Sequence, residues 1–434
     1  MNHEALLETA RTAESIRLRG KVNQMVGLVI ESNGPPVSVG ELCEIRSNGA
    51  MTGVDAEVVG FRDNKVLLMP LGPVDGVGPG STVTPNNEPF SVRVGDELLG
   101  RVLNGLGRPI DDKGPVWCKA NRPVNGQPPD PMRRQRIREP LGTGIRAIDG
   151  LITCGRGQRV GIFAGSGVGK SVLMGMIARN SEADINVIAL IGERGREVRD
   201  FLERDLGEEG LRRSVVVVVT SDQPALVRIK GALVATAIAE HFRDTGADVM
   251  LMMDSVTRVA MAQREVGLAI GEPPTTRGYT PSVFAFLPKL LERAGMAERG
   301  SITGLYTVLV EGDDTNEPVS DTTRSILDGH ISLSRRLASQ GHYPAVDVLE
   351  SVSRVMVDVA DREHTAAANQ IRDTMSTYRE AQDLINIGAY RRGNNPRIDF
   401  AIERIDRINA FLKQGIDEHA DFQSTREMVM RLLE

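Results

Sequence analysis

The 434 residues exceed what a single compact core usually holds, so the sequence predicts two or three domains. Apolar residues make up 41 % and charged residues 25 %, as in soluble globular proteins, and the net charge of −6 argues against general nucleic-acid binding. The three cysteines, Cys43, Cys118 and Cys154, lack metal-ligand spacing, and such a sparse set favours a reducing cytosol over a disulfide framework.

The first predicted element, over residues 1–19, is a short amphipathic helix. Leu6, Ala10, Ala13 and Ile16 recur every three or four positions. The helix is either a frayed terminus or a docking helix for a partner or a membrane surface.

Residues 20–90 predict a small β domain. Short apolar runs at 25–30, 57–61 and 65–69 lie between clusters of Gly, Pro and Asn, which is typical of a small sandwich or barrel. The turn-rich segment 105–130 then predicts a surface connection without core elements of its own.

Strand and helix patterns alternate from about residue 157. The predicted strands are 159–163, 185–191, 214–220, 249–253 and 302–310, with candidate helices at 170–179 and 224–243. This alternation predicts a parallel sheet with helices on its faces, in an α/β domain over 91–357. Residues 358–434 show no convincing strand and predict a helical domain.

The most informative motif follows the first of these strands. It consists of Ala164-Gly165-Ser166-Gly167-Val168-Gly169-Lys170-Ser171, between a strand and a helix, the context that identifies a phosphate-binding P-loop. The glycines let backbone N–H groups wrap around phosphates, and the helix N-terminus adds its positive dipole end. Lys170 is predicted to contact the β- and γ-phosphates, and Ser171 to offer its hydroxyl to Mg²⁺. The sequence therefore predicts that the chain binds and hydrolyses Mg-ATP.

Two carboxylates are expected at the same edge of the sheet. Asp254 ends the strand 249–253 and is predicted to hold Mg²⁺, partly through water; a helix cap is the alternative. Glu193 follows the strand 185–191 and is predicted to polarise the attacking water; a surface capping residue is the alternative.

Further motifs resemble those of a known family. Pro344-Ala345-Val346-Asp347 and Ser351-Val352-Ser353-Arg354 resemble the signature of the catalytic and regulatory subunits of rotary ATP synthases. Within that family the chain resembles the flagellar type III export ATPases, through Gly271-Glu272-Pro273-Pro274, Ala381-Gln382-Asp383-Leu384-Ile385-Asn386-Ile387-Gly388-Ala389-Tyr390 and Phe411-Leu412-Lys413-Gln414-Gly415.

The resemblance implies a fold and further site residues. The fold would be a small N-terminal β-barrel, a RecA-like parallel-sheet ATPase core and a helical C-terminal domain. Arg354 would be an arginine finger that reaches the γ-phosphate bound to the next subunit of a homohexamer. Tyr343 would stack on the adenine, and Arg194 would lie beside Glu193 near the γ-phosphate. The residues alone would place Arg354 on a surface helix and Tyr343 in the core.

The resemblance also implies a role and partners. The chain would be a cytoplasmic motor, peripherally attached to the inner-membrane export apparatus, that energises type III protein export for flagellum assembly. Its partners would be a dimeric regulator at the N-terminal helix, a coiled-coil stalk protein in the central pore near 271–284, an export-gate membrane protein, and export substrates with their chaperones. Nucleic acid is not expected.

Four alternatives remain open at this point. The chain could serve a virulence injectisome, or be a rotary ATP synthase subunit with unlike partners. A hexameric helicase is disfavoured by the net charge of −6. A catalytically dead scaffold is disfavoured because Lys170, Ser171, Glu193, Asp254 and Arg354 occur together.

Overall fold

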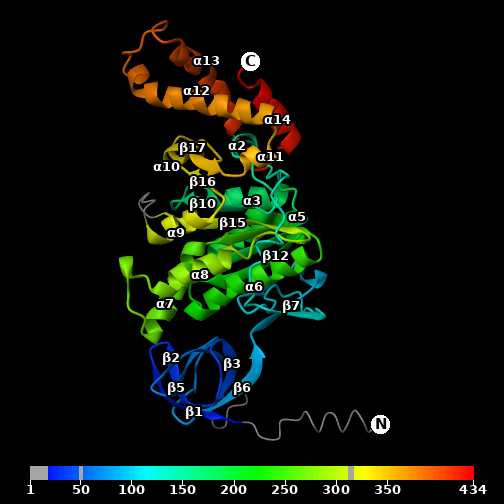
Figure 1. The fold of residues 1–434 in the computed structure, drawn as a ribbon, viewed down its shortest axis with the longest axis vertical. Coiled ribbons are helices and arrows are strands. Elements are labelled where there is room, and N and C mark those ends of the chain that lie inside the picture. The colour runs from blue at the N-terminus through cyan, green and yellow to red at the C-terminus, as the bar shows by residue number, and fades with distance from the viewer. Residues whose placement is uncertain (1–17, 48–51, 311–316) are drawn as a thin grey trace. The chain divides into compact units, whose positions relative to one another are not determined.

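A computed structural model describes residues 18–47, 52–310 and 317–434 (Figure 1). The predicted helix over 1–19 therefore lies almost wholly outside the described residues. Within the described ranges, no helix combines the length and apolar character that a bilayer span requires.

The N-terminal β domain is a closed barrel of six antiparallel strands in the order β1-β2-β5-β4-β3-β6. The strands are β1 Gly20–Val26, β2 Val29–Asn33, β3 Glu41–Arg46, β4 Val54–Arg62, β5 Lys65–Pro70 and β6 Thr82–Pro89. Alternate residues of each strand point inward, and side chains such as Ile30, Ile45 and Leu68 fill the interior. The barrel that the resemblance implied is confirmed.

The ATPase part of the chain is built on a second sheet, in the order β17-β16-β10-β15-β13-β11-β12-β8, with β14 paired to β15. Its strands are β8 Val102–Asn104, β10 Arg159–Ala164, β11 Ile185–Glu193, β12 Ser214–Thr220, β13 Asp248–Asp254, β14 Gly295–Met296, β15 Ser301–Leu309, β16 Gly329–Leu333 and β17 Val346–Ser353. β17 runs antiparallel to β16 and β14 antiparallel to β15, whereas the other pairs are parallel. A separate two-stranded sheet pairs β7 Ser91–Val94 with β9 Ala120–Pro123.

Helices cover both faces of this sheet. The α-helices are α2 Arg146–Leu151, α3 Lys170–Asn180, α4 Gly195–Asp200, α5 Gly207–Arg212, α6 Ala225–Asp244, α7 Val256–Ile270, α8 Pro281–Leu291, α9 Pro318–Ile326, α10 Arg335–Ser339 and α11 Met356–Val359. The described residues of this part also form two 3-10 turns, η1 Asp96–Leu98 and η3 Thr276–Gly278, and a π-helix, η2 Phe201–Leu206. α8 begins inside the segment 271–284, because Pro281 fits the first position of a helix.

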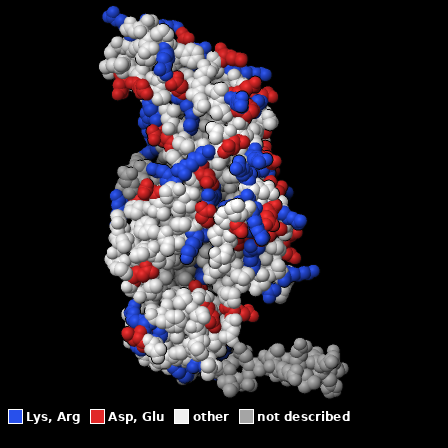
Figure 2. All heavy atoms as spheres, viewed as in Figure 1, with Lys and Arg blue, Asp and Glu red and all other residues white. Residues whose placement is uncertain are grey.

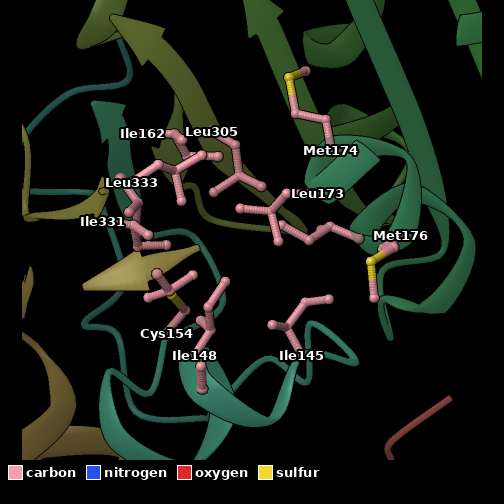
Figure 3. Close-up of a cluster of buried hydrophobic side chains, with 14 of the residues drawn as sticks. Ile145, Ile148, Cys154, Ile162, Leu173, Met174, Met176, Leu305, Ile331 and Leu333 are labelled. Atoms are coloured by element: carbon pink, nitrogen blue, oxygen red, sulfur yellow. The ribbon is translucent and has the colours of Figure 1, made fainter. Parts of the chain in front are cut away.

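α3 and α6 lie on opposite faces of the sheet. Val218 belongs to the buried cluster that includes α3. Its neighbour Val219 packs closely against α6, because a Cβ atom built on Gly231 of α6 would lie only 2.4 Å from Val219 Cγ2. Successive strand residues point to opposite faces. Leu173 of α3 points toward Leu305 of β15 in the close-up of this cluster (Figure 3). This packing fixes the helix that begins at the P-loop.

Residues 358–434 contain helices and no strand, as predicted. They form α12 Arg362–Asn386, α13 Pro396–Leu412 and α14 Phe422–Arg431. A Cβ on Gly150 of α2 would lie 2.8 Å from Val429 and 3.1 Å from Phe411, so α13 and α14 pack closely against α2. The buried cluster of the sheet therefore continues into these helices.

Candidate active site

The P-loop occupies the turn between β10 and α3. Gly167 and Gly169 have φ angles of 77° and 91°, a region that strains residues with a side chain. Gly169 is the N-cap of α3 and provides no side-chain cap. The first N–H groups of α3 therefore face the loop without an internal partner, which is the arrangement that binds phosphate.

Lys170 is the meeting point of the predicted catalytic side chains. Its Nζ forms a hydrogen-bonded ion pair with Asp254 Oδ1 and lies 3.7 Å from Glu193 Oε1. The three residues come from three elements, α3, β13 and β11, whose ends share the carboxyl edge of the parallel sheet. The structure thus brings together a cation and two carboxylates beside the P-loop.

A bulge in β11 directs Glu193 toward this site. The pairing with β12 shifts register between Ile191 and Glu193, and Gly192 between them has a φ angle of 77°. Bulges of this kind re-aim a side chain next to active sites. The neighbouring helix α4 is not capped by the Glu193 side chain, since its N-cap is Arg194 and no side-chain cap is present.

Asp254 is also held by a residue of β15. The residue is 3 % exposed, and Thr307 Oγ1 donates a 2.7 Å hydrogen bond to its Oδ1. The alternative that Asp254 caps the following helix is wrong. In the first turn of that helix, Arg258 N donates a 3.3 Å hydrogen bond to Ser255 Oγ instead. The carboxylate therefore remains directed at Lys170.

The electrostatic environment makes Glu193 basic for a carboxylate. Burial, together with the negative charge of Asp254, raises the pKa of the Glu193 carboxyl to about 7, while Lys170 opposes this shift. A carboxylate whose pKa lies near working pH is suited to take a proton from water.

This pKa gives a testable pH dependence. Because the base must be ionised, kcat/KM for ATP should fall below pH 7, by about tenfold per pH unit. The measurement is kcat/KM from pH 5.5 to 8.5 at saturating Mg²⁺. Mg-ATP binding to Glu193→Gln over the same range controls for titration of the nucleotide. A rate that stays flat to pH 5.5 would exclude Glu193 as the titrating base.

The oxygen donors at this edge suit Mg²⁺. Ser171 supplies a hydroxyl at the exposed start of α3, and Asp254 supplies a carboxylate. Mg²⁺ prefers such hard oxygen ligands and keeps several waters. Among the described residues no group of three or more His, Cys, Asp or Glu side chains could hold a metal ion.

The family resemblance added three residues to the expected site, Tyr343, Arg194 and Arg354, and they lie in different parts of the structure. Tyr343 lies beside the P-loop, because a Cβ built on Gly169 would be 3.5 Å from its Cε1, and it is 46 % exposed rather than in the core. Arg194 has a side chain that is 83 % exposed and is paired only loosely with Glu197, at 3.8 Å.

Arg354 lies at the far edge of the sheet from its own P-loop. β17 pairs Val346 with Leu333 at the P-loop edge and Ser353 with Gly329 at the opposite edge. Arg354 follows directly, and its N–H donates to Asp328 O at 2.9 Å. It is exposed and follows a strand, so the expectation of a surface helix from the residues alone is wrong.

Arg258 is a site residue that the sequence analysis missed. Its Cβ would lie 2.9 Å from a Cβ on Gly192, so it packs against the turn that carries Glu193. Its Nε is buried and has no hydrogen-bond partner among the described residues. Its place four residues after Asp254, near the start of α7, is a sequence signal that could have found it.

Comparison with known proteins gives the same order of domains. Family models match the ATP synthase alpha/beta family β-barrel domain over residues 22–87, the nucleotide-binding domain of that family over 144–353, and the C-terminal domain of the type III secretion ATPase EscN over 360–431.

Individual relatives match over nearly the whole chain. The flagellum-specific ATP synthase of Bacillus subtilis is 57 % identical over 423 residues, 97 % of this chain and 96 % of the relative. The assembled ATPase EscN from the enteropathogenic E. coli type III secretion system superposes with a TM-score of 0.91 at 47 % identity, over 96 % of this chain and 100 % of that chain. EscN in complex with its central stalk EscO gives a TM-score of 0.89 at 46 % identity, with the same coverage.

The fold and the site define a P-loop ATPase with a RecA-like core. The nearly full-length similarity then places it more narrowly. The chain belongs to the ATP synthase alpha/beta family, in its type III export ATPase branch. The family resemblance predicted from the sequence is confirmed.

Proposed function

We propose that this chain hydrolyses Mg-ATP as a ring of identical subunits and thereby energises type III protein export for flagellum assembly. The observation that carries the proposal is the convergence of Lys170, Glu193 and Asp254 at the P-loop of a chain with this ancestry.

The chemistry assigns one task to each side chain. Lys170 moves from Asp254 to the β- and γ-phosphates when ATP binds, because the nucleotide brings more negative charge. Ser171 and Asp254 hold Mg²⁺, which when bound neutralises charge on the phosphate oxygens. Glu193 orients the attacking water and accepts its proton. Arg194 and Arg258 supply further positive charge around the γ-phosphate.

The proposal of a site shared between subunits is based on the position of Arg354. A residue at the far edge of the sheet cannot reach the nucleotide on its own P-loop, but it can serve that of a neighbour. We therefore assign it as an arginine finger in trans, within a homohexamer. Tyr343 precedes the same strand, β17, and lies beside Gly169, where it contacts the adenine of its own subunit.

Partners are assigned by analogy with the relatives. EscN forms a complex with a central stalk, EscO, and we extend a stalk partner to this chain, together with a dimeric regulator, an export-gate membrane protein, and export substrates with chaperones. The protein would work in the cytoplasm at the inner-membrane export apparatus. On the face drawn in Figure 2, the described Lys and Arg side chains alternate with Asp and Glu, which gives the helicase alternative no support there.

Three measurements test this proposal. Specific ATPase activity should rise cooperatively with protein concentration, because complete sites form only between subunits. It should stop when EDTA removes Mg²⁺, because the ion is needed to neutralise charge on the phosphate oxygens. Activity that is independent of concentration would contradict the shared site.

Expression in strains that lack either their flagellum-specific ATPase or their injectisome ATPase separates the flagellar role from the injectisome role. Restored swimming supports the flagellar role, and restored secretion alone supports the alternative.

A further inference from the structure

Gln414 is a buried polar residue in the turn after α13, far in sequence from the P-loop. The residue is 5 % exposed. Its Nε2 donates to the backbone oxygens of Gly144 and Glu418, both at 2.8 Å, and its Oε1 accepts from Arg146 N at 2.9 Å. Both N–H donors and the oxygen of the amide are therefore used. A buried amide with all its bonds made holds its own backbone in one position.

Gln414 binds the turn at residues 144–146, and this turn is itself held by a hydrogen bond to a side chain of α2. Gly144 N donates to Asp149 Oδ2 at 2.9 Å, while Gly144 O accepts from Gln414. Arg146 is the first residue of α2, whose N-cap Ile145 provides no side-chain cap. Gln414 thus satisfies an N–H group that the start of a helix leaves without a partner. The turn and residue 414 are fixed to each other.

The backbone of Gln414 in turn holds Tyr343. Gln414 N donates to Tyr343 O at 2.9 Å. The Tyr343 ring lies against Gly169 of the P-loop and is 46 % exposed, so surface remains on the ring for a planar base. The placement of the ring therefore depends on a residue that lies after α13.

The same segment is also joined to the phosphate end of the site. Arg179, in the last turn of α3, donates from Nη2 to Ile416 O at 2.8 Å. Lys170 begins this helix. The segment 411–418 therefore contacts both the helix that carries the P-loop lysine and the residue that faces the base.

We propose that Gln414 is a positioning residue for base recognition, which sets the place of the Tyr343 ring against the P-loop. It acts on the affinity for the base and leaves phosphoryl transfer unaffected. The inference rests on the proposed contact between Tyr343 and adenine.

The test distinguishes recognition of the base from recognition of the phosphates. Gln414→Ala should raise KM for ATP about three- to tenfold with kcat within about twofold, since only a contact equal in ground and transition states is lost. The inhibition constant of Mg-tripolyphosphate, a competitor without a base, should not change. Gln414→Glu keeps the shape but loses both N–H donors, and should give the same KM shift if Gln414→Ala does not fold. Gln423→Ala, on the exposed face of α14, is the matched control and should behave as wild type.

A double variant decides the outcome. In a Tyr343→Ala background, Gln414→Ala should add no further increase in KM. If Tyr343→Ala itself leaves KM unchanged, the adenine contact is wrong and the inference falls with it. If Tyr343→Ala raises KM but the Gln414 variants match wild type, or weaken tripolyphosphate as much as ATP, the positioning role alone is overturned.

Discussion

Arg354→Ala should lower the turnover of ATP by about 10³- to 10⁵-fold, the range measured for arginine fingers, while ATP still binds. The guanidinium would meet charge that develops on the γ-phosphate in the transition state, so its loss affects kcat more than affinity. The measurement is kcat beside the binding of a fluorescent ATP analogue. Arg362→Ala, an exposed arginine at the start of α12, is the control and should keep wild-type activity.

A mixing experiment shows whether the finger acts between subunits. Arg354→Ala keeps its own Glu193, and Glu193→Gln keeps its own Arg354. In an equal mixture of the two inactive variants, about a quarter of the interfaces join an intact base to an intact finger, and activity should reappear. If activity stays absent while mixed rings form, the finger does not act in trans.

Glu193→Gln should lower kcat by about 10²- to 10⁴-fold, the usual contribution of a general base. The amide keeps the shape of the carboxyl but cannot accept the proton of water. It also removes negative charge near the γ-phosphate, so ATP should bind at least as tightly as to wild type. Single-turnover hydrolysis and equilibrium binding of ATP measure the two effects.

The neighbouring carboxylate provides the control for this substitution. Glu197→Gln changes a side chain that is 52 % exposed and should reduce kcat by less than about tenfold. If Glu193→Gln retained near-normal turnover and Glu197→Gln did not, the base would have to be reassigned to Glu197.

Sequence patterns predicted the elements whose signals are local. β10, the P-loop and α3 form a strand, a glycine turn and a helix in consecutive residues, so periodicity and turn chemistry were sufficient. Asp254 and Glu193 followed because each ends an apolar strand, and parallel strands share one edge for their carboxyl ends.

The elements that the sequence did not reveal depend on distant contacts. β17 is an edge strand that pairs with β16, and it carries polar residues that weaken its strand pattern. Gln414 belongs to a motif that supports the family resemblance, but its contacts with Gly144 and Tyr343 exist only because the fold brings these distant segments together. Arg258 lies on α7, and its contact with Gly192 of β11 likewise appears only in the folded chain.

The direction of β17 has a consequence for assembly. Tyr343 lies shortly before its start, at the subunit's own P-loop, and Arg354 follows its last residue at the opposite edge of the sheet. With Arg354 proposed as a finger for the neighbouring P-loop, each subunit would bind its own nucleotide at one edge and offer its finger at the other, so the subunits would associate head to tail. Such heterologous contacts either close into a ring or continue as an open chain. In an open arc one terminal P-loop has no finger and one terminal finger has no nucleotide. Closure therefore completes one more active site than the arc possesses, and ring opening would switch off a site without any change inside a subunit.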